Sequence, residues 1–307
     1  MNTKPKRKQF AVILMIVSAL CATIMQSFSK SLSNLNLMQR IFFKDIFCVI
    51  LTFIMIIRSK EATFHIKKGG KKWVLLRCIL SLISFICLFY ATDYMNLADA
   101  NILYRMSPFF ILILSHFFLK ERLNYIKVFC IVIAMLGSIL VIKPQFNSEF
   151  GSSMIGLASA VSAGAMYVIL KLLSNDNNSL TLAFYNVLFS TGISLPFVFT
   201  NTIPLTSHNL YTLIGLGIFS ALSQIMATVA VKYAPVSEIT IYNYASIFFS
   251  MIIGILFFKD YPDIQSILGA ILIIGSGIFL YIRRFNINPQ EKKLMPPNLS
   301  KNDKIRK

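Results

Sequence analysis

The chain has 307 residues, of which 56% are hydrophobic and only 14% are charged, and its mean hydropathy is +0.69. Soluble domains have about a quarter charged residues, so this composition excludes an ordinary soluble enzyme or binding module. The net charge of +18 would suit a nucleic-acid-binding protein, but the basic residues lie between long apolar runs and no nucleic-acid-binding motif accompanies them. We therefore expect a protein whose partner is the lipid bilayer, with no nucleic-acid partner.

Ten apolar runs follow one another along the chain. Each is close to the ~20 residues that a helix needs to cross a hydrocarbon core about 30 Å thick. Runs of this length satisfy their backbone hydrogen bonds as helices, whereas a transmembrane β-barrel needs short alternating segments. The sequence thus predicts an all-α integral membrane protein with ten transmembrane helices. The predicted spans are residues 10–29, 38–57, 73–92, 99–119, 125–142, 153–173, 180–200, 209–231, 237–258 and 264–282.

The first run also resembles a signal peptide, because basic residues precede it. No small-x-small cleavage site follows it, so we interpret it as a retained span. The five cysteines all fall inside predicted spans, where we expect them to act as small hydrophobic residues. Their spacing matches no metal site, so we expect neither a metal nor a cofactor.

Basic residues are concentrated at alternate connections between the spans. They precede the first span, separate spans two and three and spans four and five, and fill the segment after the last span. The connections 93–98 and 201–208 contain no Lys or Arg. This positive-inside pattern places both termini in the cytoplasm of a multi-pass protein of the inner or plasma membrane. Residues 1–9 are then a basic cytoplasmic N-terminus, and residues 286–307 a basic cytoplasmic tail that we expect to be disordered.

The two halves of the chain resemble each other. Segment 91–139 aligns without a gap with segment 230–278. Each half, 10–145 and 146–285, then holds five spans, and because five is odd the second half enters the membrane from the opposite side. Such inverted repeats enclose a central cavity and can open it to either side in turn. Equivalent charged positions are Lys30 and Lys171, Lys120 and Lys259, and Glu121 and Asp260.

Several segments resemble the signature of a known carrier family. In the first half they are Phe89-Tyr90-Ala91-Thr92 through Ala98, Pro108-Phe109-Phe110, Leu119-Lys120-Glu121-Arg122-Leu123 and Gly137…Lys143-Pro144, echoed by Tyr233-Ala234-Pro235, Phe258-Lys259-Asp260 and Gly269…Gly275-Ser276-Gly277. Their order and duplication are similar to the EamA-type ten-helix carriers of the drug/metabolite transporter superfamily. The chain departs from that pattern at Ile247, where the first copy has Pro108, and at Asp260, where the family has Glu.

The resemblance implies a basket-shaped bundle around a cavity lined mainly by spans one, three, four, six, eight and nine. It also implies that the substrate is a small metabolite, such as an amino acid, a nucleoside- or adenosyl-containing compound, or a sugar. The fold alone does not select among these substrates.

Ionisable residues inside the predicted spans mark candidate binding positions, because each costs about 2.5–3.5 kcal/mol to insert. Span two carries Arg40 and Lys44 on one helical face with Asp45 adjacent, span three carries Arg77, and span four carries Arg105. Four cations against one acid make the expected cavity electropositive, which favours an anionic or carboxylate-bearing solute. The alternative is that some of these residues form structural pairs or extend to the membrane border.

Arg105 is the deepest of these cations in its span. It lies beside Pro108, which removes a backbone donor in mid-span and frees a carbonyl near Tyr104. Polar and aromatic residues accompany the cations, although stripes of Ser, Thr and Gln hold helices together more often than they bind ligands, and tyrosines could stack on a ring or only fill the core. Besides the four cations, the candidate substrate-binding residues are Tyr90, Asn101, Tyr104, Gln224, Tyr242, Asn243 and Ser246.

We therefore expect a secondary-active transporter of a small organic metabolite working by alternating access, with a homodimer left open. An intramembrane lipid-modifying enzyme is the first alternative, but no paired carboxylates, His-x-x-x-His or Gly-x-Ser-x-Gly lies in any span. A channel is the second, but no selectivity loop is visible. Acids other than Asp45 lie near span ends or in loops, which argues against proton-driven efflux of cationic drugs.

Overall fold

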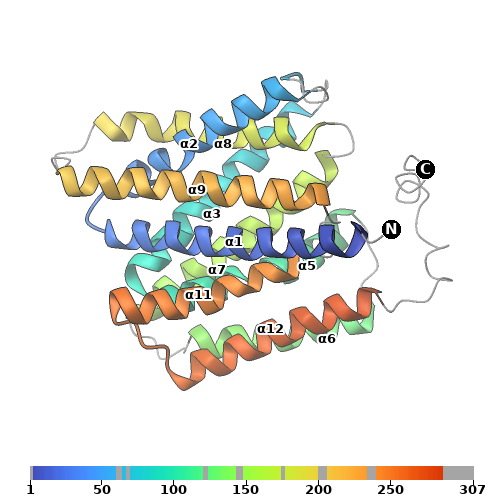
Figure 1. Ribbon diagram of the computed structural model, residues 1–307. Helices are drawn as coiled ribbons and strands as arrows, with labels where there is room; N and C mark the ends of the chain where they lie inside the picture. The colour runs from blue at the N-terminus through green and yellow to red at the C-terminus, as the bar shows by residue number, and fades with distance from the viewer. Residues whose placement is uncertain are drawn as a thin grey trace.

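The computed structural model is a bundle of helices that run roughly along one common direction (Figure 1). It describes residues 3–59, 64–66, 70–119, 124–142, 148–173, 177–199, 206–233 and 240–285, and these residues contain no β-strand. The α-helices are α1 Thr3–Ser31, α2 Leu37–Arg58, α3 Lys71–Tyr94, α4 Leu97–Tyr104, α5 Ser107–Leu119, α6 Tyr125–Ile142, α7 Ser148–Leu173, α8 Ser179–Phe199, α9 Ser207–Tyr233, α11 Ala245–Ile253 and α12 Ile264–Phe285. A 3₁₀ helix, η1 Thr240–Tyr244, precedes α11, and a π-helix, η2 Gly254–Phe258, follows it.

Eight helical stretches within the described residues are long and apolar enough to cross a membrane. They are Gln9–Ser31, Lys71–Tyr94, Leu97–Leu119, Tyr125–Ile142, Phe150–Leu173, Ser179–Val198, Ser207–Ala230 and Ile264–Ile282. The two remaining predicted spans are also helical but differ in kind. Helix α2 has 22 residues and carries three ionisable side chains in its first half, and Tyr242–Phe258 is a shorter apolar helix. The chain is thus a multi-pass, all-helical membrane protein.

The loops that carry most of the predicted basic clusters, and the tail 286–307, lie outside the described residues. Helix α1 begins at Thr3, so most of the segment expected as a basic N-terminus continues the first helix. Helix α12 ends on the side of the bundle where α1 begins (Figure 1). We call that side the N-terminal end of the bundle and the other side the opposite end.

Each helix of the bundle packs against particular neighbouring helices. Helix α1 packs against α9 and α3 against α7; α2 contacts α8 and α9, and α8 contacts α3; α5 packs on α7 and α11 on α1; α6 pairs with α12. Figure 1 shows α2 and α8 at one edge of the bundle and α6 and α12 at the other edge, with α1, α3, α7 and α9 between them.

Glycines allow α6 and α12 to approach closely. A Cβ atom added to Gly269 would lie 2.6 Å from the carbonyl oxygen of Gly137, and one added to Gly137 would lie 2.9 Å from the carbonyl oxygen of Gly269. Neither contact leaves room for a side chain. Small residues at such crossings let helix backbones pack directly in a membrane, where apolar burial between helices gives little driving force.

Helical geometry changes at Arg105 and again at Tyr244. Helix α4 ends at Tyr104 and α5 begins at Ser107, with Pro108 in the first turn of α5, where its missing N–H and fixed φ are tolerated. In the other half, η1 ends at Tyr244, the residue that aligns with Arg105, and α11 follows directly. Both interruptions therefore fall at the same aligned position of the two halves.

Candidate functional site

The site is built around Arg105, which the interruption between α4 and α5 places inside the bundle. Its Nε donates a hydrogen bond to the Ser246 hydroxyl of α11 at 2.8 Å. Its guanidinium carbon lies 5.8 Å from the centre of the Tyr104 ring, and Tyr167 of α7 and Tyr244 are within electrostatic reach. The two terminal amino groups of Arg105 make no hydrogen bond to the described residues, and the side chain keeps some accessible surface. They can therefore bind a carboxylate through two parallel hydrogen bonds.

Polar contacts from α1 hold the residues next to Arg105. Thr23 donates to the carbonyl oxygen of Ala19 at 2.9 Å and approaches that of Ser246 at 3.5 Å. Asn101 of α4 is fully buried and donates from Nδ2 to Gln26 Oε1 at 2.6 Å. Helix α1 is thus fixed against both α4 and α11, the two elements that carry Arg105 and its partner.

The tyrosine side of the site is held by α3 and α7. Ser84 of α3 donates to the Ser159 carbonyl oxygen of α7 at 2.9 Å, and its hydroxyl lies close to that of Tyr104. Tyr167 remains 45% exposed and lies near Arg105. The arrangement combines one cation with aromatic faces and hydroxyl groups, so it can bind a solute that has both a carboxylate and an apolar or aromatic part.

Arg40 lies apart from this group and makes a buried ion pair. Its two terminal nitrogens reach the two carboxylate oxygens of Asp93 at 2.8 and 2.5 Å, and one of them also donates to the Ser29 carbonyl oxygen at 2.7 Å. Arg40 is 1% exposed and Asp93 8%. The pair joins α1, α2 and α3 near the opposite end of the bundle.

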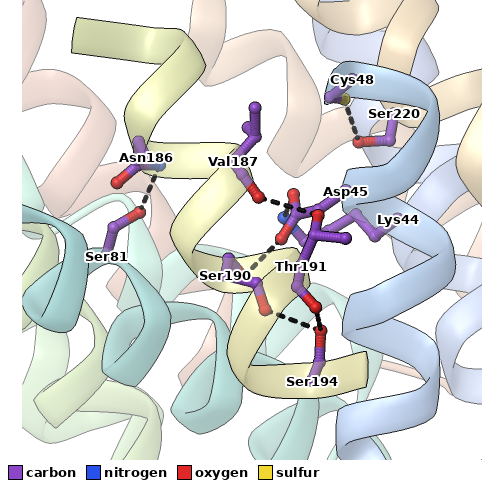
Figure 2. Close-up of polar contacts among 10 residues, drawn as sticks. All are labelled: Lys44, Asp45, Cys48, Ser81, Asn186, Val187, Ser190, Thr191, Ser194 and Ser220. Atoms are coloured by element: carbon purple, nitrogen blue, oxygen red, sulfur yellow. Dashed lines mark hydrogen bonds and ion pairs between the residues drawn. The ribbon is translucent and has the colours of Figure 1, made fainter. Parts of the chain in front are cut away.

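Lys44 and Asp45 form a second buried pair, in the contact between α2 and α8 (Figure 2). Lys44 Nζ lies 2.5 Å from Asp45 Oδ1, and Ser190 of α8 donates to Asp45 Oδ2 at 2.5 Å. The ammonium group also lies 3.8 Å from the centre of the Phe85 ring of α3. Both side chains are almost completely buried, so this pair is held entirely by protein groups.

Arg77 is a third separate cation. It is buried and donates from a terminal nitrogen to the Leu182 carbonyl oxygen of α8 at 2.7 Å. This contact ties the first half of α3 to the beginning of α8. Arg40, Lys44 and Arg77 therefore do not converge with Arg105 in this structure, although all four cations lie inside the bundle.

The remaining candidate residues spread along the bundle. The Tyr90 ring packs on that of Tyr94, 4.6 Å between centres. Tyr242 packs against the apolar cluster of Ala11, Met15 and Ala230 near the N-terminal end. Gln224 accepts a hydrogen bond from Thr228 through its backbone, and its side chain is partly buried, as is that of Asn243. The structure brings Tyr104, Asn101 and Ser246 close to Arg105, whereas the contacts described for Tyr90 and Tyr242 are with other residues.

Residues at the opposite end form a polar pocket that the sequence did not single out. The pocket has a volume of about 310 Å³. An ion pair between Lys30 of α1 and Asp260, which precedes α12, lies beside it; Asp260 also accepts from the Leu97 backbone N–H at 3.1 Å. The alignment of Lys30 with Lys171 and of Asp260 with Glu121 was the signal that could have indicated these residues. Lining residues are Lys30, Asp93, Tyr94, Met95, Asn96, Asp99, Val141, Ile142, Ser153 and Asp260.

Among the residues that the structure describes, no group of three His, Cys, Asp or Glu side chains could hold a metal ion. The five cysteines are free thiols inside helices, four of them buried.

Comparison with known proteins gives a consistent family. The EamA-like transporter family matches residues 9–143 and 151–282. Similar proteins include the pseudopaline exporter of Pseudomonas aeruginosa, 27% identical over 88% of this chain and 95% of that protein. Solute carrier family 35 member G1 of Homo sapiens is 24% identical over 92% of this chain and 84% of that protein. The S-adenosylmethionine uptake transporter of Rickettsia conorii is 25% identical over 56% of this chain and 59% of that protein.

A solved crystal structure shares the fold, with a TM-score of 0.61 and 15% sequence identity over 87% of this chain and 94% of that one. The relatives are named as transporters rather than enzymes, and the structure has the apolar helices of a multi-pass membrane protein. This chain therefore belongs to the EamA-like transporter family.

Proposed function

We propose that this protein is a secondary-active carrier that moves a small carboxylate-bearing metabolite across the inner or plasma membrane by alternating access. The observation that carries the proposal is Arg105, a cation inside a membrane bundle whose terminal amino groups have no partner among the described residues. An uncompensated charge inside a bilayer protein is costly and marks a substrate or ion pathway. A carboxylate supplies the missing counter-charge and matches the geometry of a guanidinium group.

An inverted-repeat architecture of ten spans, in halves 10–145 and 146–285, supports alternating access. If α1 to α6 form the first half and α7 to α12 the second, the most extensive helix contacts map onto one another when the halves are exchanged. The α1–α9 contact becomes α7–α3, the α5–α7 contact becomes α11–α1, and the α2–α9 contact becomes α8–α3, while α2–α8 and α6–α12 map onto themselves. This exchange is what a pseudo-two-fold axis through the bundle would produce, and it supports the proposed inverted repeat.

The aligned interruptions at Arg105 and Tyr244 support a central binding site. Discontinuous helices at the interface of two repeats expose backbone groups where they line a cavity, and carriers bind substrate there. In this proposal Arg105 binds the carboxylate, and Tyr104, Tyr167 and Tyr244 contact the rest of the solute. Arg40 and Arg77, which already have partners, hold helices together instead.

The orientation follows from the positive-inside pattern, with the N-terminal end of the bundle in the cytoplasm. The ion pairs Lys30–Asp260 and Arg40–Asp93 then close the external side. The relatives are named for both export and uptake, so the direction of net transport depends on the gradients of this carrier's own substrate and coupling ion.

Counterflow into proteoliposomes tests the proposal. The probes are labelled glutamate, methionine, lactate, S-adenosylmethionine and uridine, with the same unlabelled compound inside. We expect saturable counterflow of at least one carboxylate and none of uridine, with a loss of at least about tenfold in Arg105→Ala because a charged hydrogen bond inside a protein contributes about 1.5–3 kcal/mol.

Two serines provide matched variants. Ser246→Ala removes the partner of Arg105 Nε, whereas Ser250→Ala, one turn further along α11, removes a hydroxyl that bonds only to the Ile247 carbonyl oxygen of its own helix. We expect the first variant to weaken transport and the second to leave it unchanged. Non-saturable flux without counterflow would indicate a channel, and equal transport by wild type and Arg105→Ala would overturn the role of Arg105.

A further inference from the structure

The buried pair of Lys44 and Asp45 has no role in the binding site described above. Asp45 is 2% exposed and, among the described residues, is the one acid in the middle of an apolar helix. A buried ion pair costs more in lost hydration than it returns in attraction, so replacing it by apolar residues is often neutral or stabilising. Helix α2 therefore does not need this pair to pack. A titratable group kept inside a membrane protein at such a cost is a candidate for ion coupling.

We propose that Asp45 binds the proton that crosses the membrane together with the solute, so that the carrier is a symporter of a proton and a carboxylate. This inference rests on the proposed transport function and adds its energy source. In the structure both carboxylate oxygens of Asp45 are hydrogen-bonded, one to Lys44 and one to Ser190.

The surroundings of Asp45 can accommodate both of its protonation states. When a proton from the aqueous phase binds to the carboxylate, the Ser190 hydroxyl can turn from donor to acceptor and keep its hydrogen bond. Lys44 loses its counter-ion but stays over the Phe85 ring, 3.8 Å from its centre, and a desolvated cation–π contact of this kind contributes about 2 kcal/mol. This contact offsets part of the cost of leaving the ammonium group without its counter-ion.

Other titratable groups close to Asp45 do not replace it. Cys48 of the same helix is within its electrostatic reach and contacts the Ser220 hydroxyl of α9 at 3.3 Å. Arg40, one turn earlier, is paired with Asp93. The neighbouring helices α3 and α8 carry further titratable groups in this region, and each of these has a partner of its own.

On α8, Asn186 bonds to Ser81 of α3, and the Tyr185 hydroxyl donates to the Phe64 carbonyl oxygen beyond the helix end. The titratable groups of α3 in this region, Arg77 and Cys78, both donate to backbone carbonyl oxygens of α8. Figure 2 shows that Lys44, Asp45 and Ser190 meet where α2 and α8 pack together.

Charge balance sets the direction of coupling. In the empty carrier, Arg105 has no counter-ion and Asp45 is ionised. In the loaded carrier, the solute adds one negative charge at Arg105 and the proton adds one positive charge at Asp45. The net charge that moves with the protein is then unchanged, which avoids the cost of carrying a charge through the hydrocarbon region. Proton antiport would remove a positive charge while an anion is bound, so symport is favoured.

The location of the pair gives it a way to act on transport. The α2–α8 contact lies on the proposed pseudo-two-fold axis, where the two halves must move against each other. With Asp45 ionised, Ser190 ties α8 to α2 through a hydrogen bond to a charged group. Protonation weakens that tie, because a hydrogen bond between a neutral carboxyl group and a hydroxyl lacks the assistance of the charge. Proton binding at Asp45 thereby changes the relative position of the two halves. By the same linkage, a movement of the halves changes how strongly Asp45 binds the proton.

A first experiment measures the binding of a proton to Asp45 in the absence of any solute. Infrared difference spectra of the purified protein between alkaline and acidic buffers are compared for wild type, Asp45→Asn and Ser81→Ala. We expect a carbonyl band of a protonated carboxylic acid that is present in wild type and Ser81→Ala and missing in Asp45→Asn. The Ser81 variant is the matched control because it loses a polar contact of the same region, that with Asn186, without losing a titratable group. Identical spectra of wild type and Asp45→Asn would overturn the proposal.

A second experiment uses the labelled carboxylates of the counterflow panel with an acidic exterior and the membrane potential clamped. We expect Asp45→Asn to lose gradient-driven accumulation by at least about tenfold, within the usual range of coupling energies, while it keeps counterflow. Equal accumulation by wild type and Asp45→Asn would overturn proton coupling and leave the proposed transport function intact. If no panel compound moves in wild type, the transport proposal fails for these compounds, and the infrared comparison still decides whether Asp45 binds a proton.

Discussion

Lys30 and Asp260 form an ion pair that joins the end of the first helix to the connection before the last one. Lys30 also donates to the Met95 carbonyl oxygen at 3.0 Å, and Asp260 accepts from the Leu97 N–H. The end of α1 and two connections of the chain thus meet at the opposite end of the bundle, beside the 310 Å³ pocket. We interpret this meeting point as the closed external gate of the carrier.

The gate predicts that Asp260→Asn makes the pocket more accessible. The pair is only partly exposed, so losing its charge should cost about 1–2 kcal/mol and raise the open population by about tenfold. The measurement is the rate at which a membrane-impermeant maleimide labels a cysteine introduced at Asn96, which lines the pocket. Asp260→Glu, which keeps the charge, should label at nearly the wild-type rate; equal rates for Asn and wild type would contradict the gate.

The Arg40–Asp93 pair predicts a large loss of stability when only one partner is removed. Arg40→Met leaves the buried Asp93 carboxylate without its cation, which should cost about 3–5 kcal/mol. The melting temperature in detergent should fall by about 5 °C or more, measured with a thiol-reactive dye that reports exposure of the cysteines. The double variant Arg40→Met/Asp93→Leu should recover most of the loss. A single variant as stable as wild type would show that the pair is not held as described.

The contact between α6 and α12 predicts a sharp difference between two glycines of the same helix. Gly269→Val places a side chain 2.6 Å from the Gly137 carbonyl oxygen, so the two backbones must separate. A Cβ atom added to Gly275 meets no atom within 4 Å. We expect the first variant to lower the melting temperature by several degrees, because overpacking costs about 1–3 kcal/mol, and the second to change it little. Similar effects at both positions would argue against the close crossing.

Gly277 predicts a change in binding without a large loss of stability. A Cβ at this position would lie 2.5 Å from the Tyr244 hydroxyl, the free end of a side chain that can move. Gly277→Ala should therefore displace the Tyr244 ring from the neighbourhood of Arg105. We expect the KM for the transported carboxylate to change several-fold while the melting temperature stays within a few degrees of wild type. An unchanged KM would place Tyr244 outside the binding site.

Helix positions were predictable because a long apolar run in lipid must satisfy its own backbone hydrogen bonds, and it does so as a helix. Helices occur at all the predicted spans, and the break after α4 follows the sequence closely, since Pro108 cannot continue a helix through its own N–H. The matching interruption at Tyr244 was not predictable, because the second half has Ile247 in place of the proline. It depends on packing around Gly277 and Ser246, which only the folded structure reveals.

The site was predictable in its residue types but not in its pairings. Arg105 and Ser246 were both candidates, yet their hydrogen bond joins positions 141 residues apart. The partner of Arg77 is a backbone carbonyl oxygen, that of Leu182, and every residue has such an acceptor, so no sequence pattern can indicate it. Arg40 likewise pairs with an aspartate that the sequence placed only near the end of a span.

Helix α2 has a consequence for how the protein enters the membrane during synthesis. It carries Arg40, Lys44 and Asp45, and two groups that satisfy them, Asp93 and Ser190, are translated 53 and 145 residues later than the side chains they bind. Each charge alone opposes partition into lipid by about 2.5–3.5 kcal/mol. A nascent chain ending after this helix therefore lacks the groups that would make its passage favourable. We therefore expect the stable insertion of α2 to be delayed until α3, and finally α8, have emerged from the ribosome.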